Sequence, residues 1–219
     1  MSGIARDQAK RVLMLTTASA AWFALLLQFP LTLRTSIANG MTLIGAILTY
    51  FSFFTLLTNL LVALVLTFPL LAPNSRWGRF FSSTVVGTGT ALYIATVAVV
   101  YSILLRHSWN PEGLDKLADI ILHDVVPVLY VAFWMFFVPK SGLRWRNPLS
   151  WAIYPISYLA SILTRGAISG RYPYPFVDVG QLGYPRVLLN SVLLLAIFLM
   201  VGLGVVAVAR RNLPSAGVN

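Results

Sequence analysis

The stretch from Met41 to Leu71, MTLIGAILTYFSFFTLLTNLLVALVLTFPLL, contains no charged residue. An apolar run of this length exceeds the roughly 20 residues that a helix needs to cross the hydrocarbon core of a bilayer. The stretch therefore predicts a transmembrane helix that is tilted or that begins in the headgroup region.

The composition of the whole chain agrees with a membrane protein. Of the 219 residues, 58% are hydrophobic and 10% are charged, and the mean hydropathy is +0.80. A water-soluble domain of this composition would expose large apolar patches and aggregate. Because six spans of roughly 20 residues with short loops nearly use up the chain, we predict a single membrane domain over residues 1–219.

Six apolar segments predict an all-α fold, a polytopic integral membrane protein built as a bundle of six transmembrane helices. The basic start with Ala18-Ser19-Ala20 is also compatible with a signal peptide, but the apolar run continues past that site, which favours an uncleaved span. The predicted spans are residues 12–33, 41–71, 82–105, 120–138, 149–163 and 187–209.

The distribution of Lys and Arg predicts the orientation. The N-terminus, the second and fourth loops and the C-terminus carry 10 of these residues, against 6 in the other three loops. The excess predicts that both termini lie on the cytoplasmic side of a plasma or inner membrane. Although the net charge is +10, the cations are scattered over loops rather than collected in one stripe, so nucleic acid is not a predicted partner.

Polar side chains are scarce in the predicted spans, and those of span 41–71 share one helical face. Ser52, Thr55 and Asn59 recur at spacings of three and four residues, which brings side chains to the same side of a helix. Because a polar group in hydrocarbon costs free energy unless it has a partner, this face is predicted to point into the bundle. Two interpretations stay open: the face joins helices through structural contacts, or it carries a reactive group.

A second polar group lies at the start of the predicted span 120–138. Asp119 and His123 are four residues apart, so a helix places them one turn apart on the same face, where the carboxylate would hold the imidazole in one tautomer. His107 lies in a polar loop and is predicted to be solvated. His123 is therefore the candidate general base, and the competing interpretation is a hydrated residue at the membrane interface.

The fifth loop, residues 164–186, contains alternating Pro and aromatic residues in Tyr172 to Val179, YPYPFVDV. Such a segment is stiff and extended and has large apolar faces. It is predicted either to lie along the membrane surface or to cap a cavity.

Three motifs together resemble a known family. They are Tyr50 to Val62, YFSFFTLLTNLLV; the His-x-x-x-Pro of His123 to Pro127; and YPYPFVDV after Arg165-Gly166. In this order and with six spans, the chain resembles the bacterial Pr-six-Pr membrane proteins. These are distant relatives of the eukaryotic androgen-induced and androgen-dependent integral membrane proteins.

The resemblance implies an activity and two residues. The eukaryotic branch consists of membrane threonine hydrolases that cleave the ester bond of fatty acid esters of hydroxy fatty acids, with a threonine on span two and a histidine on span four. By position, these roles fall on Thr55 and His123. Where the eukaryotic sequences have Asp or Asn three residues after the threonine, this chain has Thr58, followed by Asn59, so Thr58 competes as the nucleophile.

Two functions follow. The first is an intramembrane hydrolase of lipid esters, with Thr55 as nucleophile, His123 as base, Asp119 in support and the Asn59 amide as the candidate donor to the oxyanion. The second is a binder or carrier of lipids or other amphiphilic small molecules, without catalysis. No cysteine is present, and two distant histidines rarely form a zinc site, so no cofactor or metal is predicted. A channel is disfavoured because no filter-like sequence or carboxylate ring occurs.

Overall fold

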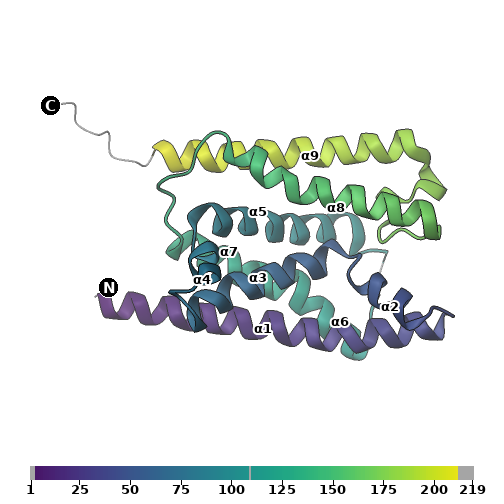
Figure 1. The fold of residues 1–219 in the computed structure, drawn as a ribbon, viewed down its shortest axis with the longest axis horizontal. Coiled ribbons are helices and arrows are strands. Elements are labelled where there is room, and N and C mark those ends of the chain that lie inside the picture. Colours follow the sequence, from purple (N-terminus) through teal and green to yellow (C-terminus); the bar gives the residue numbers. More distant parts are fainter. Residues whose placement is uncertain (1–2, 109, 212–219) are drawn as a thin grey trace. The chain divides into compact units, whose positions relative to one another are not determined.

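The structure is a computed structural model that describes residues 3–108 and 110–211 (Figure 1). Within these residues every regular element is a helix and none is a strand, which confirms the all-α prediction for this part of the chain. Two elements, η1 and η2, are π-helices, and η3 is a 3₁₀-helix. In chain order the elements are α1 Gly3–Ala38, α2 Leu43–Tyr50, α3 Phe54–Leu71, α4 Arg76–Phe81, α5 Thr84–Val100, η1 Tyr101–Leu105, α6 Gly113–Ile120, η2 Ile121–Val125, α7 Val126–Phe137, α8 Asn147–Ser169, η3 Pro175–Val177 and α9 Val179–Arg211.

In the described part of the chain, five helical stretches are long and apolar enough to cross a bilayer, as a multi-pass membrane protein requires. They are Gly3–Ala38, Phe54–Leu71, Thr84–Leu105, Gly113–Phe137 and Val179–Arg211. The fifth predicted span, 149–163, lies within α8, whose 23 residues would reach across a bilayer but include Pro155 and several polar residues. A crossing by α8 stays a prediction.

The predicted span 41–71 is not one helix, because the chain leaves helical geometry between α2 and α3. Phe53 is extended, with φ −88° and ψ 124°. Two hydroxyls bond back to carbonyl oxygens one turn earlier, Thr49 to Gly45 at 2.8 Å and Ser52 to Leu48 at 2.5 Å. Such bonds compete with the helical ladder, and they accompany the end of α2 at this point.

Other boundaries differ from the sequence prediction as well. The first helix begins at Gly3 rather than residue 12, since the polar residues there are good helix formers. The predicted fifth loop is mostly helical: α8 extends to Ser169 and α9 begins at Val179. A kink at Gly183, with φ 71° and ψ 158°, interrupts α9, and a residue without Cβ adopts that conformation readily.

Contacts divide the chain after Val138 into two compact units, here named unit 1 (α1 to α7) and unit 2 (α8 and α9). This division leaves the prediction of a single membrane domain open, and residues 1–2 and 212–219 of that domain lie outside the described part.

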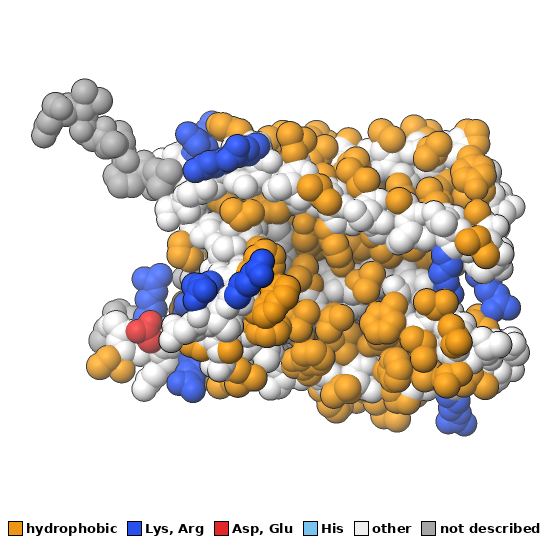
Figure 2. Space-filling model, in the orientation of Figure 1, with side chains coloured by type: hydrophobic (Ala, Val, Ile, Leu, Met, Phe, Trp, Pro, Cys, Tyr) orange, Lys and Arg blue, Asp and Glu red, His pale blue; other side chains and the backbone are white. Residues whose placement is uncertain are grey.

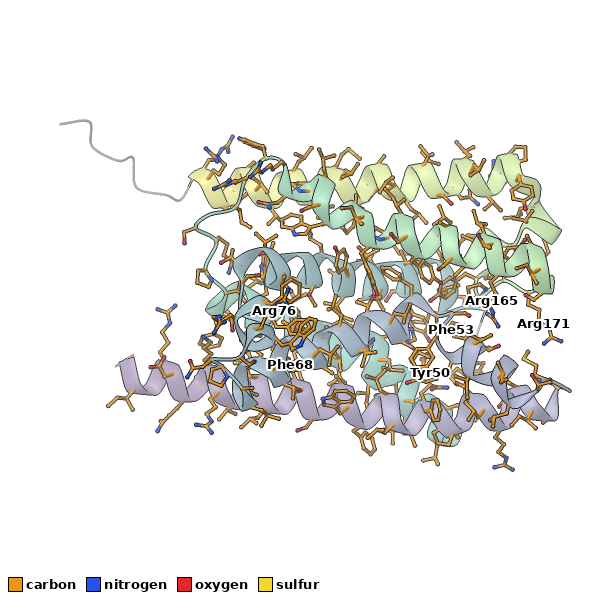
Figure 3. All side chains as sticks on the ribbon, in the orientation of Figure 1. Tyr50, Phe53, Phe68, Arg76, Arg165 and Arg171 are labelled. Atoms are coloured by element: carbon orange, nitrogen blue, oxygen red, sulfur yellow. The ribbon has the colours of Figure 1, made fainter. Side chains whose placement is uncertain are left out.

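In unit 1, α3 packs closely against α1 (Figure 1). Small side chains on α1 permit this approach, since Ala21 and Ala24 are fully buried. Polar groups join the helices too. Trp22 of α1 donates to the Thr67 hydroxyl of α3 at 3.1 Å. Tyr50 of α2, which is labelled in Figure 3, donates to the Leu25 carbonyl of α1 at 2.9 Å.

In unit 2, α8 and α9 run side by side in opposite directions (Figure 1). Ile162 of α8 and Val187 of α9 form a buried cluster with Val177 of η3. The segment after α8 folds back on it closely, since a Cβ added to Gly166 would overlap the ring of Tyr172.

The outer surfaces are apolar along the helices. On the visible face, hydrophobic side chains cover much of α1 and α9, and Lys and Arg lie near the ends of these two helices (Figure 2). This distribution suits helices whose middle parts face lipid.

Candidate active site

Two π-helical turns shape a polar site in unit 1. In η1 the Arg106 amide donates to the Tyr101 carbonyl at 2.8 Å, and in η2 the Val126 amide donates to the Ile121 carbonyl. Each bond spans five residues, so the turn is wider than an α-helical turn. Single π-helical turns of this kind are frequent at functional sites.

Thr55 and His123 meet in this site, although 68 residues separate them in sequence. Thr55 is the second residue of α3, and its hydroxyl lies 3.2 Å from Nε2 of His123 in η2. Thr55 is 6% exposed, and the His123 side chain is 13% exposed. The pair is therefore largely enclosed by protein, and His123 keeps a small exposed area.

The surroundings of His123 determine its tautomer. Nδ1 lies 3.0 Å from the carboxylate Oδ1 of Asp119 and 3.0 Å from the backbone carbonyl of the same residue. Both groups accept hydrogen bonds, so Nδ1 carries the proton. In the neutral imidazole Nε2 then holds the lone pair, and it accepts the hydrogen bond from the Thr55 hydroxyl.

Asp119 is held from a second side by Tyr101 of η1. The Tyr101 hydroxyl donates to Oδ2 of Asp119 at 2.5 Å. The tyrosine ring also stacks on the imidazole of His123, with ring centroids 3.7 Å apart and an interplanar angle of 15°. Sequence reasoning missed Tyr101, since it is one aromatic residue in an apolar span and no spacing rule connects it with Asp119.

Asn59 lies beneath the pair and is completely buried. Its amide nitrogen donates to the Thr55 carbonyl at 2.9 Å and to the Leu122 carbonyl at 3.2 Å. Both amide hydrogens are thus engaged, so the predicted use of this amide as an oxyanion donor does not fit the structure. Asn59 instead joins α3 to η2, next to His123, and its Oδ1 has no hydrogen-bond partner.

Ser52 of the predicted face and Thr58, the competing nucleophile, are buried as well. Ser52 is 5% exposed and lies before α3, and Thr58 is fully buried within α3. The burial of Ser52, Thr55 and Asn59 confirms that these side chains point into the protein, but Ser52 precedes α3, so the three do not share one helical face.

An ion pair lies beside the site, between the same two π-helical segments. Arg106 donates to the Asp124 carboxylate at 2.5 Å, and its guanidinium lies 5.0 Å from the centre of the Tyr101 ring. The hydrogen bond to Asp124 raises the pKa of the Arg106 guanidinium above its ordinary value. Both side chains of the pair are about 40% exposed, at 42% and 40%, so they border the site rather than fill it.

In the described part of the chain, no group of three or more His, Cys, Asp or Glu side chains is placed to hold a metal ion. The third motif, from Tyr172 to Val179, lies in unit 2. Within that unit the rings of Tyr174 and Phe176 stack at 5.3 Å, and Asn190 of α9 donates to the Phe176 carbonyl at 3.0 Å.

The site thus combines a hydroxyl, an imidazole with a fixed tautomer and a carboxylate, the three groups of an acid–base relay to an oxygen nucleophile. Comparison of the chain with protein-family models, curated proteins and solved structures finds no match.

Proposed function

We propose that this protein is an intramembrane hydrolase of lipid esters in which Thr55 is the nucleophile and His123 the general base. The observation that carries the proposal is the 3.2 Å contact between the Thr55 hydroxyl and Nε2 of His123, combined with the Asp119 contacts at Nδ1. A threonine hydroxyl is a weak nucleophile until a base within hydrogen-bond reach removes its proton. The proposal includes membership of the bacterial Pr-six-Pr family, which rests on the three sequence motifs.

The first half of the reaction would acylate Thr55. Oγ1 attacks the carbonyl carbon of the ester while Nε2 of His123 takes the hydroxyl proton, and Asp119 stabilises the imidazolium. The tetrahedral intermediate then collapses, the bond to the alcohol oxygen breaks, and His123 returns the proton to that oxygen. Because Thr55 lies in the first turn of α3, the developing oxyanion would form beside the positive end of the helix dipole.

The second half would release the acid. His123 removes a proton from water, the resulting hydroxide attacks the acyl-threonine, and the proton returns to Oγ1 of Thr55 as the ester bond breaks. The sum is one ester and one water converted to an acid and an alcohol, without any redox step or cofactor.

A lipid substrate suits the position of the site. His123 lies about 10 Å along the helix from Lys116, at about 1.5 Å per residue. Lys116 favours the headgroup region, so the pair would lie near the boundary between headgroups and acyl chains, where the ester groups of amphiphiles reside. With both termini in the cytoplasm and α8 as a crossing helix, this boundary belongs to the outer leaflet, from which the substrate would enter laterally.

The test is a fluorophosphonate probe applied to the purified protein in detergent. Labelling of the wild-type chain that disappears in Thr55→Ala and in His123→Ala supports the hydrolase. Thr58→Ala is the matched control, because it removes a buried hydroxyl from the same helix. Loss of labelling in Thr58→Ala with retention in Thr55→Ala would assign the nucleophile to Thr58 instead.

The second candidate function is a non-catalytic binder or carrier of lipids or small amphiphiles. It is favoured by Oδ1 of Asn59, a buried acceptor without a partner, because leaving such a group unpaired costs free energy that a hydroxyl-bearing ligand would recover. Absence of labelling, together with saturable binding of a fluorescent long-chain alcohol that Asn59→Leu weakens, would favour this function over the hydrolase.

A further inference from the structure

Tyr101 makes three contacts around the proposed catalytic pair, more than the proposed reaction itself requires. Its hydroxyl donates to Oδ2 of Asp119 at 2.5 Å, its ring covers the imidazole of His123 at 3.7 Å, and Arg106 approaches the ring at 5.0 Å. Tyr101 is 5% exposed, so its contacts with Asp119 and His123 lie inside the protein, while Arg106 is at the border of the site.

The hydroxyl contact divides the Asp119 carboxylate between two donors. Oδ2 accepts from Tyr101, while Oδ1 is 3.0 Å from Nδ1 of His123. Without the tyrosine hydroxyl, the carboxylate could rotate about its terminal side-chain bond, which is a soft torsion. The hydrogen bond from Tyr101 therefore fixes which carboxylate oxygen accepts the hydrogen bond from Nδ1 of His123.

The stacked ring of Tyr101 restricts rotation of the His123 imidazole. A stacked neighbour at 3.7 Å prevents the ring of His123 from turning toward Tyr101. Nδ1 is tied to Asp119 at one edge of the imidazole, and Nε2 faces Thr55 at the other. Orientation of a base within a few tenths of an ångström has a large effect on proton transfer.

The chain geometry explains how a residue 22 positions before His123 reaches it. Tyr101 opens the π-helical turn η1, and His123 lies in the π-helical turn η2. The ion pair between Arg106 and Asp124 joins the same two segments at the outer edge. The two widened turns thus meet through one aromatic and one ionic contact.

We infer that Tyr101 is a positioning residue, which holds Asp119 and His123 in the orientation that activates Thr55. This inference rests on the proposed function. Because its hydroxyl is committed to Asp119, Tyr101 acts through its neighbours and transfers no proton to the substrate.

The kinetic test compares fluorophosphonate labelling rates of three tyrosine variants in the full-length protein. Tyr101→Phe keeps the stacked ring and loses the hydrogen bond, so labelling should slow by about 10-fold, the lower end of the effect of removing a group that orients a reactive residue. Tyr101→Leu loses both contacts and should slow labelling by about 100-fold. Tyr130→Phe is the matched control, since it removes a buried hydroxyl that donates to the Gly87 carbonyl, and should label at the wild-type rate.

A second measurement reports on the orientation of the His123 imidazole and does not require catalytic activity. The chain has two histidines, so His107→Gln leaves His123 as the single source of imidazole signals in a ¹⁵N-labelled sample. In His107→Gln with Tyr101 intact, we expect a single Nδ1-protonated tautomer of His123 and a signal from its hydrogen-bonded proton. When Tyr101→Leu is added, we expect that proton to exchange with water and its signal to be lost.

The outcomes separate the two claims. If both Tyr101 variants label at the wild-type rate and keep the His123 signal, Tyr101 has no positioning role, even where Thr55→Ala abolishes labelling. If Thr55→Ala labels normally, the hydrolase proposal fails, and the His123 spectrum alone still decides whether Tyr101 orients the imidazole. Equal slowing in Tyr130→Phe would reduce the effect to general destabilisation and overturn the inference.

Discussion

The two ends of the segment formed by α5 and η1 carry buried polar contacts of different kinds. Near its start, the Thr88 hydroxyl accepts from Trp134 at 3.1 Å, and the Gly87 carbonyl accepts from Tyr130 at 3.2 Å. At its other end, Tyr101 contacts a carboxylate and an imidazole. Both regions lie in unit 1, but their partners come from different elements: α7 near the start, and α6 and η2 at the other end.

The difference lies in chemistry rather than in burial. Around Thr88 the recorded contacts join neutral groups, which hold helices together without any exchange of protons. Around Tyr101 two of the contacts are with a carboxylate and an imidazole, groups that can gain or lose a proton, and the partners impose one tautomer on the imidazole. A buried hydroxyl in a membrane helix is therefore structural or reactive according to whether it has a basic neighbour.

The largest effect that would sharpen this comparison comes from Asp119→Asn. The new amide can donate to Nδ1 of His123, which moves the imidazole proton to Nε2 and removes the lone pair that faces Thr55. We expect fluorophosphonate labelling to fall by about 10,000-fold, as for the equivalent change in a Ser-His-Asp relay. Asp178→Asn in unit 2 is the matched control, and a rate in Asp119→Asn within tenfold of the wild type would contradict the assigned relay.

Asn59→Leu should have the next largest effect, this time on stability. It removes the bonds to the carbonyls of Thr55 and Leu122, so the free energy of unfolding should fall by about 1–2 kcal/mol, the upper part of the range for polar contacts between membrane helices. Titration with SDS measures it in micelles. Asn190→Leu in unit 2 is the control and should leave fluorophosphonate labelling unchanged. An unchanged free energy of unfolding in Asn59→Leu would show that the Asn59 amide does not join α3 to η2.

At the other end of the segment, Thr88→Val should affect stability alone. Loss of the acceptor for Trp134 should lower the free energy of unfolding by about 0.6 kcal/mol, the average for such contacts in a membrane protein. Labelling should continue at the wild-type rate. Slower labelling in Thr88→Val, at unchanged helical content by circular dichroism, would mean that the two ends are coupled.

Arg106→Gln should have the smallest effect. The ion pair with Asp124 is exposed on both sides, and exposed pairs contribute little and are screened by salt. We expect the thermal midpoint of unfolding to be unchanged at high ionic strength and slightly lower at low ionic strength. Tryptophan fluorescence measures this midpoint. A large decrease that salt does not reduce would instead indicate that the pair supports the two π-helical turns.

Sequence predicted the helical class, because long apolar runs leave few other structures in lipid. It predicted less well where helices begin and end. The run from Met41 to Leu71 is divided where the hydroxyls of Thr49 and Ser52 bond back to carbonyl oxygens of α2, and such bonds leave no mark on hydropathy. The helical extension of α1 toward Gly3 was missed because an apolar pattern marks contact with lipid, not helix itself.

For the site, spacing was informative within one helix and not between helices. The four-residue interval between Asp119 and His123 predicts a shared face, and their side chains do meet. The contacts of Thr55 with His123 and of Tyr101 with Asp119 depend on how separate helices pack, which periodicity does not encode. The role of the Asn59 amide could not be predicted, because its amide nitrogen donates to the carbonyls of Thr55 and Leu122. The position of the Leu122 carbonyl depends on how α3 packs against η2, which the sequence does not specify.

The modest apolarity of α8 has a consequence for biosynthesis. A helix with Pro155 and several polar side chains gains little by leaving the translocon for lipid on its own. Its buried contact, through Ile162 and Val187, is with α9, which is synthesised later and is strongly apolar. We therefore expect α8 to enter the bilayer as a hairpin together with α9, so that a ribosome stalled before Val179 would leave α8 accessible to water.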